Sequence, residues 1–387
     1  MVSTAAIPRR DSTQTCSPQL AQFQAVTVAH PHLVKAKESL ITAMRESEPN
    51  SIVMVFGPTG VGKTTLRLRT EQILIEDQRA ELDSNRWRIP VASVEAIAPD
   101  SGSFCWRSHF KRLLQAMGDP LTDRRRVPGS DLDDDSEERF QLTARSSGSE
   151  YRYAVEQTLR FRRPAAVMID EAQHLGKVAS GRRLLDQLDV VKSIANRTNT
   201  VHVLFGTYDL LAFRNLSGQL SRRSVDIHFP RYRADRAEER KIFVNIVHSF
   251  QKKLPLPEPP DLVKHWELLY ERTFGCVGVL KQWLVKALAA ALRRGDSTIS
   301  VRNLEDHALS IAQCDKILSE ITEGEARLNE GDGARSKLRA RLGLATASAP
   351  APGLSAPAGT DARHKLKPGH RKPARDPVGQ PVYAACV

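Results

Sequence analysis

The fold is decided by the stretch Gly57-Pro58-Thr59-Gly60-Val61-Gly62-Lys63-Thr64-Thr65. It fits the phosphate-binding pattern G-x-x-x-x-G-K-[ST], which needs a strand before it and a helix after it. The apolar run over residues 51–56 predicts a buried parallel strand, and residues 66–75 predict a helix. This context favours a phosphate-binding loop over a glycine-rich turn that only connects two elements.

Each part of the loop has a predicted contact with a nucleotide. Backbone N–H groups over residues 57–65 are expected to converge on phosphate oxygens, helped by the positive end of the following helix. Lys63 is expected to bind the β- and γ-phosphates, and the Thr64 hydroxyl is a candidate Mg²⁺ ligand. The stretch therefore predicts a nucleotide bound together with Mg²⁺.

A second informative stretch, Pro164-Ala-Ala-Val-Met-Ile-Asp170-Glu171-Ala-Gln-His-Leu175, is an apolar strand that ends in two acids. Phosphate-loop ATPases use the first such acid for Mg²⁺ and the second to polarise the attacking water. We therefore assign Asp170 to metal binding and Glu171 to general-base catalysis. The alternative is an exposed acidic pair that caps the next helix. With both acids in place, the predicted nucleotide is ATP and the predicted reaction is its hydrolysis.

Two further segments supply candidate catalytic residues. The strand over 201–205 ends at Gly206-Thr207, so Thr207 is a candidate sensor of the γ-phosphate. A turn residue or helix cap is an equal alternative for Thr207. Arg222 and Arg223 precede the next strand, and either one is a candidate for placing a positive charge on the nucleotide of a neighbouring subunit.

Beyond Pro230 the strand pattern stops. The apolar spacing predicts helices over 236–252, 262–274, 278–293 and 301–321, which together form a small helical domain. Lys281 falls on the first turn of the third helix and is a candidate phosphate ligand. An exposed lysine on a helix is the equal alternative.

Net charge and cysteine content limit the classes of protein to which this chain can belong. The 387 residues carry a net charge of +12, from 57 basic and 45 acidic side chains, which favours an anionic partner and nucleic acid first. The five cysteines are scattered, which argues against a disulfide framework or a zinc site. No apolar run approaches the length of a membrane span. We expect an intracellular, cytoplasmic protein with no membrane partner.

The sequence predicts an α/β fold in four parts. A flexible N-terminal arm over 1–27 precedes a core over 28–232, a parallel sheet with helices on both faces, interrupted by a mobile insertion over 118–150. A helical lid over 233–323 follows. The last part, 324–387, is expected to be a disordered basic tail. Within it, residues 332–387 hold ten lysines and arginines against three aspartates, a net charge of +7.

Short blocks of the chain resemble a known family. GPTGVGKTT, AAVMIDEAQHL and the strand ending in GTYDLL together are similar to AAA+ ATPases. The blocks FGTYDLL, GCVGVLKQWL and PDSGSFCWRSHFKRLLQAMGDPL narrow the resemblance to the TniB/TnsC family of transposition regulators. The resemblance covers about residues 28–320.

The resemblance implies a function on DNA. ATP binding would assemble subunits into a ring or helical filament on double-stranded target DNA. The filament would recruit a transposase, respond to a target-selection protein and disassemble on ATP hydrolysis. Family analogy also places Arg107 and Lys111, on the helix predicted over 104–117, at the DNA channel. A solvated basic helix face is the alternative for these two residues.

The same motifs are also compatible with two other functions. One is an AAA+ helicase loader, which an adjacent transposase gene would argue against. The other is a secretion-associated AAA+ ATPase acting on a protein partner. Such relatives usually carry a membrane span or a peptidoglycan-binding module, and neither is visible in this sequence.

Overall fold

The computed structural model describes residues 17–100, 102–118, 146–177, 184–214, 224–328 and 332–344. Two compact units divide the chain, Met1–Asn329 and Glu330–Val387. Residues 119–145 of the predicted insertion over 118–150 lie outside the described residues, as do the candidate residues Arg222 and Arg223. The end of that prediction is wrong, because a helix already begins at Gly148, capped by the side chain of Ser147.

A five-stranded parallel sheet forms the centre of the first unit. Its strands are β1 (Ile52–Phe56), β2 (Val91–Glu95), β3 (Ala166–Asp170), β4 (Val201–Gly206) and β5 (Ser224–His228), in the order β2-β3-β4-β1-β5. Every residue of β1, β3 and β4 is buried. Central strands of a parallel sheet are covered on both faces, which explains why these three read as continuous apolar runs.

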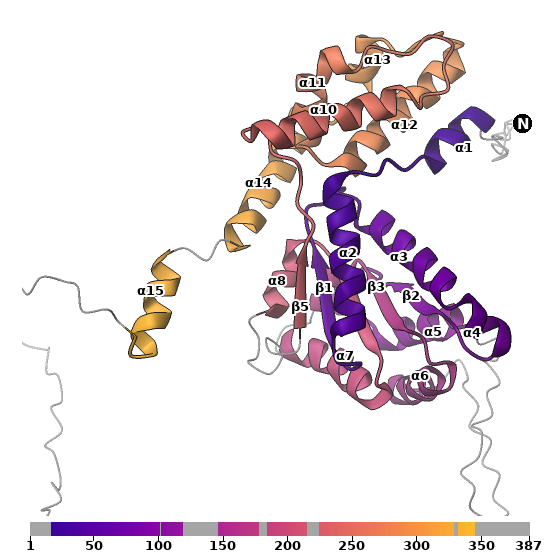
Figure 1. Ribbon diagram of the computed structural model, residues 1–387, viewed down its shortest axis with the longest axis vertical. Coiled ribbons are helices and arrows are strands. Elements are labelled where there is room, and N and C mark those ends of the chain that lie inside the picture. Colours follow the sequence, from indigo (N-terminus) through magenta and orange to yellow (C-terminus); the bar gives the residue numbers. More distant parts are fainter. Residues whose placement is uncertain are drawn as a thin grey trace, which may run out of the picture. The chain divides into compact units, whose positions relative to one another are not determined.

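Helices cover both faces of the sheet (Figure 1). On one face lie α2 (Pro31–Glu46) and α3 (Lys63–Asp77), and on the other lie α5 (Trp106–Ala116), α6 (Gly148–Arg162) and α7 (Leu184–Thr198). Along β1, Val53 and Val55 pack toward the first group, whereas Met54 and Phe56 pack toward the second. Two short helices, α4 (Arg79–Ser84) and α8 (Leu211–Arg214), complete the core. The predicted α/β architecture is confirmed.

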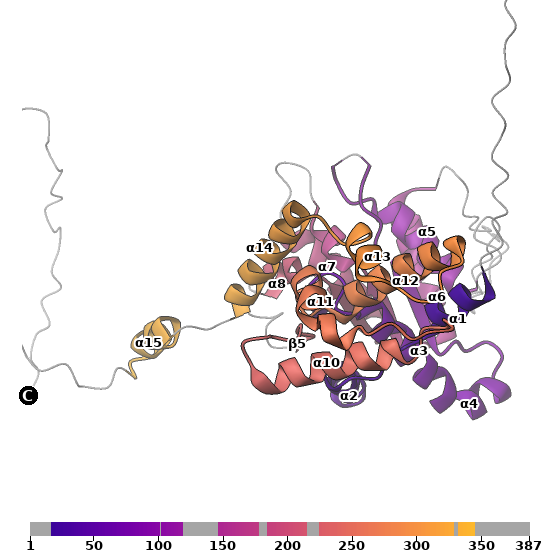
Figure 2. The ribbon, with the colours of Figure 1, turned by 90° about the horizontal axis from the view of Figure 1, so that it is seen from above.

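A helical lid lies over one end of the core (Figure 2). Its helices are α10 (Ala237–Gln251), α11 (Trp266–Thr273), α12 (Val277–Arg294) and α13 (Val301–Asp306), with a 3-10 turn η3 (Val263–His265) before α11. Their apolar sides meet in a core of their own that contains Phe243 and Leu284. The lid is therefore a separate small helical layer, as the sequence predicts.

The prediction of a single helix over 301–321 is wrong. The chain breaks after α13 and resumes as α14 (Ile311–Leu328). Ser310 explains the restart, because its hydroxyl accepts a hydrogen bond from the Gln313 backbone N–H at 3.3 Å. A side chain that satisfies a free N–H in this way favours a new helix start.

The expected flexible arm is wrong for its second half. Residues 18–25 form α1 (Pro18–Ala25), whose Phe23 is fully buried in the lid core against Phe250, with ring centroids 6.2 Å apart. Half-buried Leu20, one turn earlier, packs against the same core. Two apolar contacts in a helix of eight residues give too short a pattern to reveal a helical period in the sequence. Residues 1–16 lie outside the described residues.

The lid also runs further than predicted. Helix α14 passes Gly324 and ends at Leu328, and the second unit begins with a helix, α15 (Asp332–Arg341). Gly324 suggested a boundary, but a Cβ there would lie 2.2 Å from Cδ2 of Tyr208. The glycine thus permits close packing of α14 on the core. The prediction of a disordered tail is incorrect for residues 324–328 and 332–341, and residues 345–387 lie outside the described part.

Membrane-spanning potential is limited to one bent pair of helices. In the described ranges no single helix has the length and apolar character to cross a membrane. The segments Val263–Thr273 and Val277–Arg294 pass together by length and composition, with a bend of 114° between them. The second of these is α12, whose apolar residues pack in the lid core.

Candidate nucleotide site

The phosphate-binding loop joins β1 to α3, as its motif requires. Helix α3 begins at Lys63, and the residue before it, Gly62, has a φ of 118°, in the left-handed region that glycine adopts freely. The amino end of α3 therefore opens directly onto the loop. Free N–H groups and the helix dipole make this end suited to phosphate.

Lys63 points into its own loop. Its side-chain Nζ donates hydrogen bonds to the carbonyl oxygens of Gly57 at 3.0 Å and Pro58 at 2.9 Å, and the residue is only 7% exposed. Burial lowers the pKa of Lys63, and the nearby Glu171 and Asp170 carboxylates oppose that shift. The ammonium group is therefore held at the place where phosphates are expected.

Asp170 ends β3 with both carboxylate oxygens engaged. Oδ2 accepts from Arg67 Nε at 3.2 Å, and Oδ1 accepts from the Glu171 backbone N–H at 3.0 Å. Arg67 also donates to Ser93 Oγ at 2.8 Å. Since Arg67 follows Thr64 by three residues, the two share one side of α3, which faces the end of β3.

Arg67 was not identified from the sequence. Its spacing of one helical turn from the Lys63-Thr64 pair was the available signal, but no motif marks it. Its partner Ser93 lies on β2, which is separated from β1 by the two strands β3 and β4, so the contact exists only through the order of the sheet.

The oxygen donors near the loop fit a magnesium ion. Thr64 offers a hydroxyl and Asp170 a carboxylate, which are the hard ligands that Mg²⁺ prefers. Within the described ranges no group of three or more His, Cys, Asp or Glu side chains is placed to hold a metal alone. A metal at Thr64 and Asp170 would therefore need phosphate oxygens as well, which is how Mg²⁺ enters nucleotide sites.

A glutamine links the candidate base to the candidate sensor. Glu171 has a φ of 51° and begins the 3-10 turn η1 (Ala172–Gly176). Gln173 Nε2 donates to Glu171 Oε2, and Gln173 Oε1 accepts from the Thr207 backbone N–H at 3.2 Å. Sequence reasoning missed Gln173, because its second partner lies 34 positions away, at the end of β4.

The Thr207 hydroxyl is occupied by local hydrogen bonds. It donates to Asp209 Oδ2 at 3.3 Å and accepts from the Asp209 backbone N–H at 3.4 Å, which caps the 3-10 turn η2 (Tyr208–Leu210). The capping role weighed for Thr207 is therefore present. A sensor role would require this hydroxyl to exchange partners.

The lid contacts the phosphate-binding loop directly. The Val279 backbone N–H, in the first turn of α12, donates to the Gly60 carbonyl oxygen at 3.1 Å. A Cβ at Gly278 would lie 2.4 Å from the same oxygen, so only glycine permits this approach. Loop and lid are thus joined at the backbone with no side chain between them.

A small pocket beside the loop is built from three separate parts of the chain. It is lined by Val26, Thr27, Val28, His30, Leu33, Val61, Gly62, Thr65, Phe250, Val277, Gly278 and Lys281. Its mostly apolar lining next to the loop suits the base of a nucleotide. The pocket is thus supplied by the segment before α2 together with the start of α2, by the phosphate-binding loop with the start of α3, and by the lid.

Lys281 lies at the rim of this pocket. Its Nζ donates to the Gln24 carbonyl oxygen at 2.6 Å. Burial lowers the pKa of Lys281, and Arg69 adds to the shift. The structure therefore places Lys281 beside α1 and the candidate base pocket, and contact with a phosphate would require it to leave Gln24.

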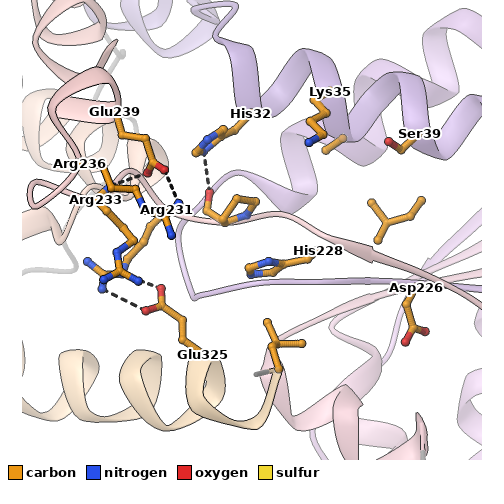
Figure 3. A pocket seen from close by; sticks show the side chains of 14 residues that line it. His32, Lys35, Ser39, Asp226, His228, Arg231, Arg233, Arg236, Glu239 and Glu325 are labelled. Carbon is orange, nitrogen blue, oxygen red and sulfur yellow. Dashed lines mark hydrogen bonds and ion pairs between the residues drawn. The ribbon is translucent and has the colours of Figure 1, made fainter. Parts of the chain in front are cut away.

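A cavity of about 620 Å³ lies along β5, between α2 and α14 (Figure 3). Its charged side chains are largely paired with one another. Arg231 makes two bonds to Glu325, at 2.8 and 3.1 Å, and Arg236 pairs with Glu239 at 2.8 Å. Since these arginines are already satisfied, we read the cavity as the place where α14 is fastened to the core.

The two candidate DNA-binding residues share a side of α5. Arg107 is exposed, with its guanidinium carbon 5.8 Å from the centre of the Tyr151 ring, and Lys111 is half-buried. They lie one helical turn apart and are not part of the phosphate-binding loop.

One family model and several solved structures match parts of this chain. Residues 45–213 match the family model described as an AAA domain. The ORC2 protein of Aeropyrum pernix in its ADP form has a TM-score of 0.50 and 14% identity, covering 74% of this chain and 71% of its own. The ORC1 protein of the same organism, in complex with DNA, has a TM-score of 0.49 and 19% identity, covering 75% and 67%.

No curated protein matches the chain. At 14% identity the likeness to solved structures shows the fold alone. Together with the domain match, the sheet order and the phosphate-binding loop, it defines an AAA domain followed by a helical lid, the fold of AAA+ ATPases.

Proposed function

We propose that this chain is an ATP-switched DNA assembly factor of the transposition-regulator type. One observation carries the ATPase part: Asp170 and Glu171 end β3 beside the loop, and Gln173 connects Glu171 to Thr207. The resemblance of the FGTYDLL and GCVGVLKQWL blocks supports the transposition part.

Hydrolysis follows from the roles of these residues. Loop amides and Lys63 bind the phosphates, and Lys63 exchanges its bonds to Gly57 and Pro58 for phosphate oxygens. Thr64 and Asp170 would hold Mg²⁺, and the ion would neutralise phosphate charge there. Glu171 accepts the proton of the attacking water, while Thr207 reports the γ-phosphate through Gln173.

The complete site is shared between subunits. Arg222 or Arg223 of a neighbouring copy adds a positive charge to the nucleotide. Lys281 completes the nucleotide contacts from the lid. The backbone hydrogen bond between Val279 and Gly60 couples the phosphate-binding loop to the lid. A nucleotide in the loop therefore shifts the lid position, and ATP binding favours the assembled form.

The assembly acts on double-stranded DNA. Arg107 and Lys111 contact its phosphates, and the transposase and the target-selection protein bind the assembled form. The basic residues of the tail offer a place for the transposase contact, since ten of them lie within 332–387.

The test is duplex binding under different nucleotides. Fluorescence anisotropy and electron microscopy should show assembly on duplex DNA with ATP or a slow analogue, and little with ADP. Arg107→Ala together with Lys111→Ala should weaken DNA binding without changing ATP binding. If nucleotide makes no difference to DNA binding, the DNA-switch proposal is wrong. If ATP-dependent assembly is the same with and without duplex DNA, the result would instead favour an ATPase acting on a protein partner.

A further inference from the structure

A cluster of arginines and aromatic rings lies at the other end of the sheet from the phosphate-binding loop. Strands β2 and β3 are neighbours, so the segments that lead into them lie side by side. The Ile89 N–H donates to the Arg162 carbonyl oxygen at 3.1 Å, which joins the two segments. We call this surface the arginine–aromatic patch; it consists of Arg86, Trp87, Arg88, Arg160, Phe161, Arg162 and Arg163. Figure 1 shows α4 and α6, which flank it, at the end of the core away from the lid.

The two rings of the patch are exposed together. Trp87 is 65% exposed and Phe161 is 50% exposed, with ring centroids 5.7 Å apart and planes at 57°. Single exposed apolar residues are ordinary, but two large rings in contact on the surface present a continuous apolar area. Trp and Arg are also the residues that dominate binding surfaces. The pair is therefore a candidate platform for a flat partner.

The positive charge around the rings is mostly uncompensated. Among the described residues Arg88 pairs with Glu81, whereas the other four arginines of the patch have no carboxylate partner. Arg162 donates to the carbonyl oxygens of Trp87 at 3.3 Å and Gly118 at 3.1 Å. These hydrogen bonds fix the position of its side chain but do not neutralise its positive charge. Arg160 likewise donates to the Arg197 carbonyl oxygen at 2.9 Å and keeps its charge. Guanidinium groups without a carboxylate partner, on two segments that lie side by side, favour an anionic partner.

The backbone at the patch is held in an uncommon conformation. Arg163 ends α6 with a φ of 44°, in the left-handed region that glycine and asparagine usually occupy at this position. A non-glycine residue there costs free energy, and such residues gather at functional sites. Keeping arginine at residue 163 adds a charge to the patch at some cost in stability.

We propose that the arginine–aromatic patch binds single-stranded nucleic acid. Unpaired bases stack on Trp87 and Phe161, and the backbone phosphates pair with the surrounding arginines. Exposed ring faces favour nucleic acid over an acidic protein, because carboxylate side chains carry no aromatic ring that stacks on them. The site shares no residue with the nucleotide site or with Arg107 and Lys111, so its binding does not require ATP.

Trp87 itself reports the binding. Trp106 and Trp266 are half-buried and Trp283 is 5% exposed, so quenching by a short thymidine oligonucleotide should come from Trp87. Trp87→Phe should keep the affinity, measured by anisotropy of a labelled oligonucleotide, and lose the quenching. Trp87→Ala with Phe161→Ala should weaken binding about tenfold or more, since each stacked base contributes about 1–3 kcal/mol.

The arginines are tested through salt dependence. Arg86→Ala with Arg163→Gly should weaken binding and flatten its dependence on salt, because fewer counterions are released. Glycine at residue 163 suits its positive φ, so a loss of binding would not reflect unfolding. Arg302→Ala with Ile311→Ala, which removes an exposed arginine and an exposed apolar side chain from the lid, is the matched control and should bind as the wild type does.

Two results would overturn the proposal. One is an unchanged oligonucleotide affinity in both patch variants. The other is quenching of Trp87 by poly-glutamate but not by the oligonucleotide, which would assign the surface to an acidic protein. Lys63→Ala should retain oligonucleotide binding, so failure of the ATP-dependent function and failure of this site are distinguishable.

Discussion

The two ends of the same sheet differ in how they hold their charges. At the carboxyl end, Lys63 and Asp170 are nearly buried and fully engaged with neighbouring groups. At the amino end, the arginine–aromatic patch is exposed and most of its guanidinium groups lack a carboxylate partner. The first arrangement is preorganised for a small anion with fixed geometry. The second presents charge and flat surface to a large and variable partner.

The difference follows from the direction of parallel strands. All five strands end at one edge, where α3 also presents its free N–H groups, so polar side chains there converge. At the opposite edge, helix α6 ends and its dipole is negative, which favours arginines in its last turn. The contrast suggests that the ends can be disabled independently, and the predictions below test this separation.

The largest expected effect comes from Glu171→Gln. The amide cannot accept a proton, so ATP turnover should fall about 10²- to 10⁴-fold, the range for loss of a general base. ATP affinity should be retained, because the loop and Lys63 are unchanged. Phosphate release and equilibrium ATP binding measure the two quantities. Normal turnover in this variant would refute the assignment of the base.

Lys63→Ala should weaken nucleotide binding at the carboxyl end and leave the amino end unchanged. A charged hydrogen bond contributes about 1.5–3 kcal/mol, so ATP affinity should fall about tenfold to a hundredfold. Oligonucleotide binding at the patch should not change. Isothermal titration with ATP and anisotropy with the oligonucleotide test the pair of outcomes, and a joint loss of both would contradict the independence of the two ends.

Gln173→Ala should have a smaller effect within the same site. It removes the link between Glu171 and the Thr207 backbone, so turnover should fall about tenfold, as expected for one hydrogen bond to a charged group. ATP affinity should stay the same. Gln19→Ala, a substitution of an exposed glutamine in α1, is the control. Turnover equal to wild type would mean that the link does not position the base.

A pH dependence of stability follows from three buried histidines. Burial lowers the pKa of His30, His109 and His202 to about 4 each. The unfolded chain, with histidine pKa values of about 6.5, therefore binds more protons than the folded chain between these values. Stability is retained above pH 6.5 and is lost as the pH falls toward 4, by up to about 1.4 kcal/mol per pH unit for each histidine.

Chemical denaturation at several pH values measures this loss. His202 lies in β4 and His30 beside the candidate base pocket, so the two report opposite ends of the sheet. Replacing His202 with glutamine should reduce the slope and leave the contribution of His30. A free energy of unfolding that is flat between pH 4 and pH 6.5 would contradict the assigned pKa shifts.

The candidate nucleotide site at the carboxyl end of the sheet could be predicted because its sequence signals are local. The loop, the acids after β3 and the glycine-threonine pair after β4 each occupy a few consecutive residues next to an apolar strand. The elements missed were those held by distant partners. Helix α1 is held by Phe23 and Leu20 against the distant lid core, and the candidate base pocket joins residues 26–33 to the lid across more than two hundred positions.

By itself, the sequence determined a phosphate-binding loop in an α/β core with a helical lid, since short motifs and apolar periodicity are local properties. Only the tertiary structure decided that Gly278 lies against Gly60, that Gln173 connects Glu171 to Thr207, and that Trp87 meets Phe161. These contacts depend on which strands are neighbours and on how the lid packs. Sheet order and lid packing are set by burial of apolar surface over the whole domain, which no short stretch of residues encodes.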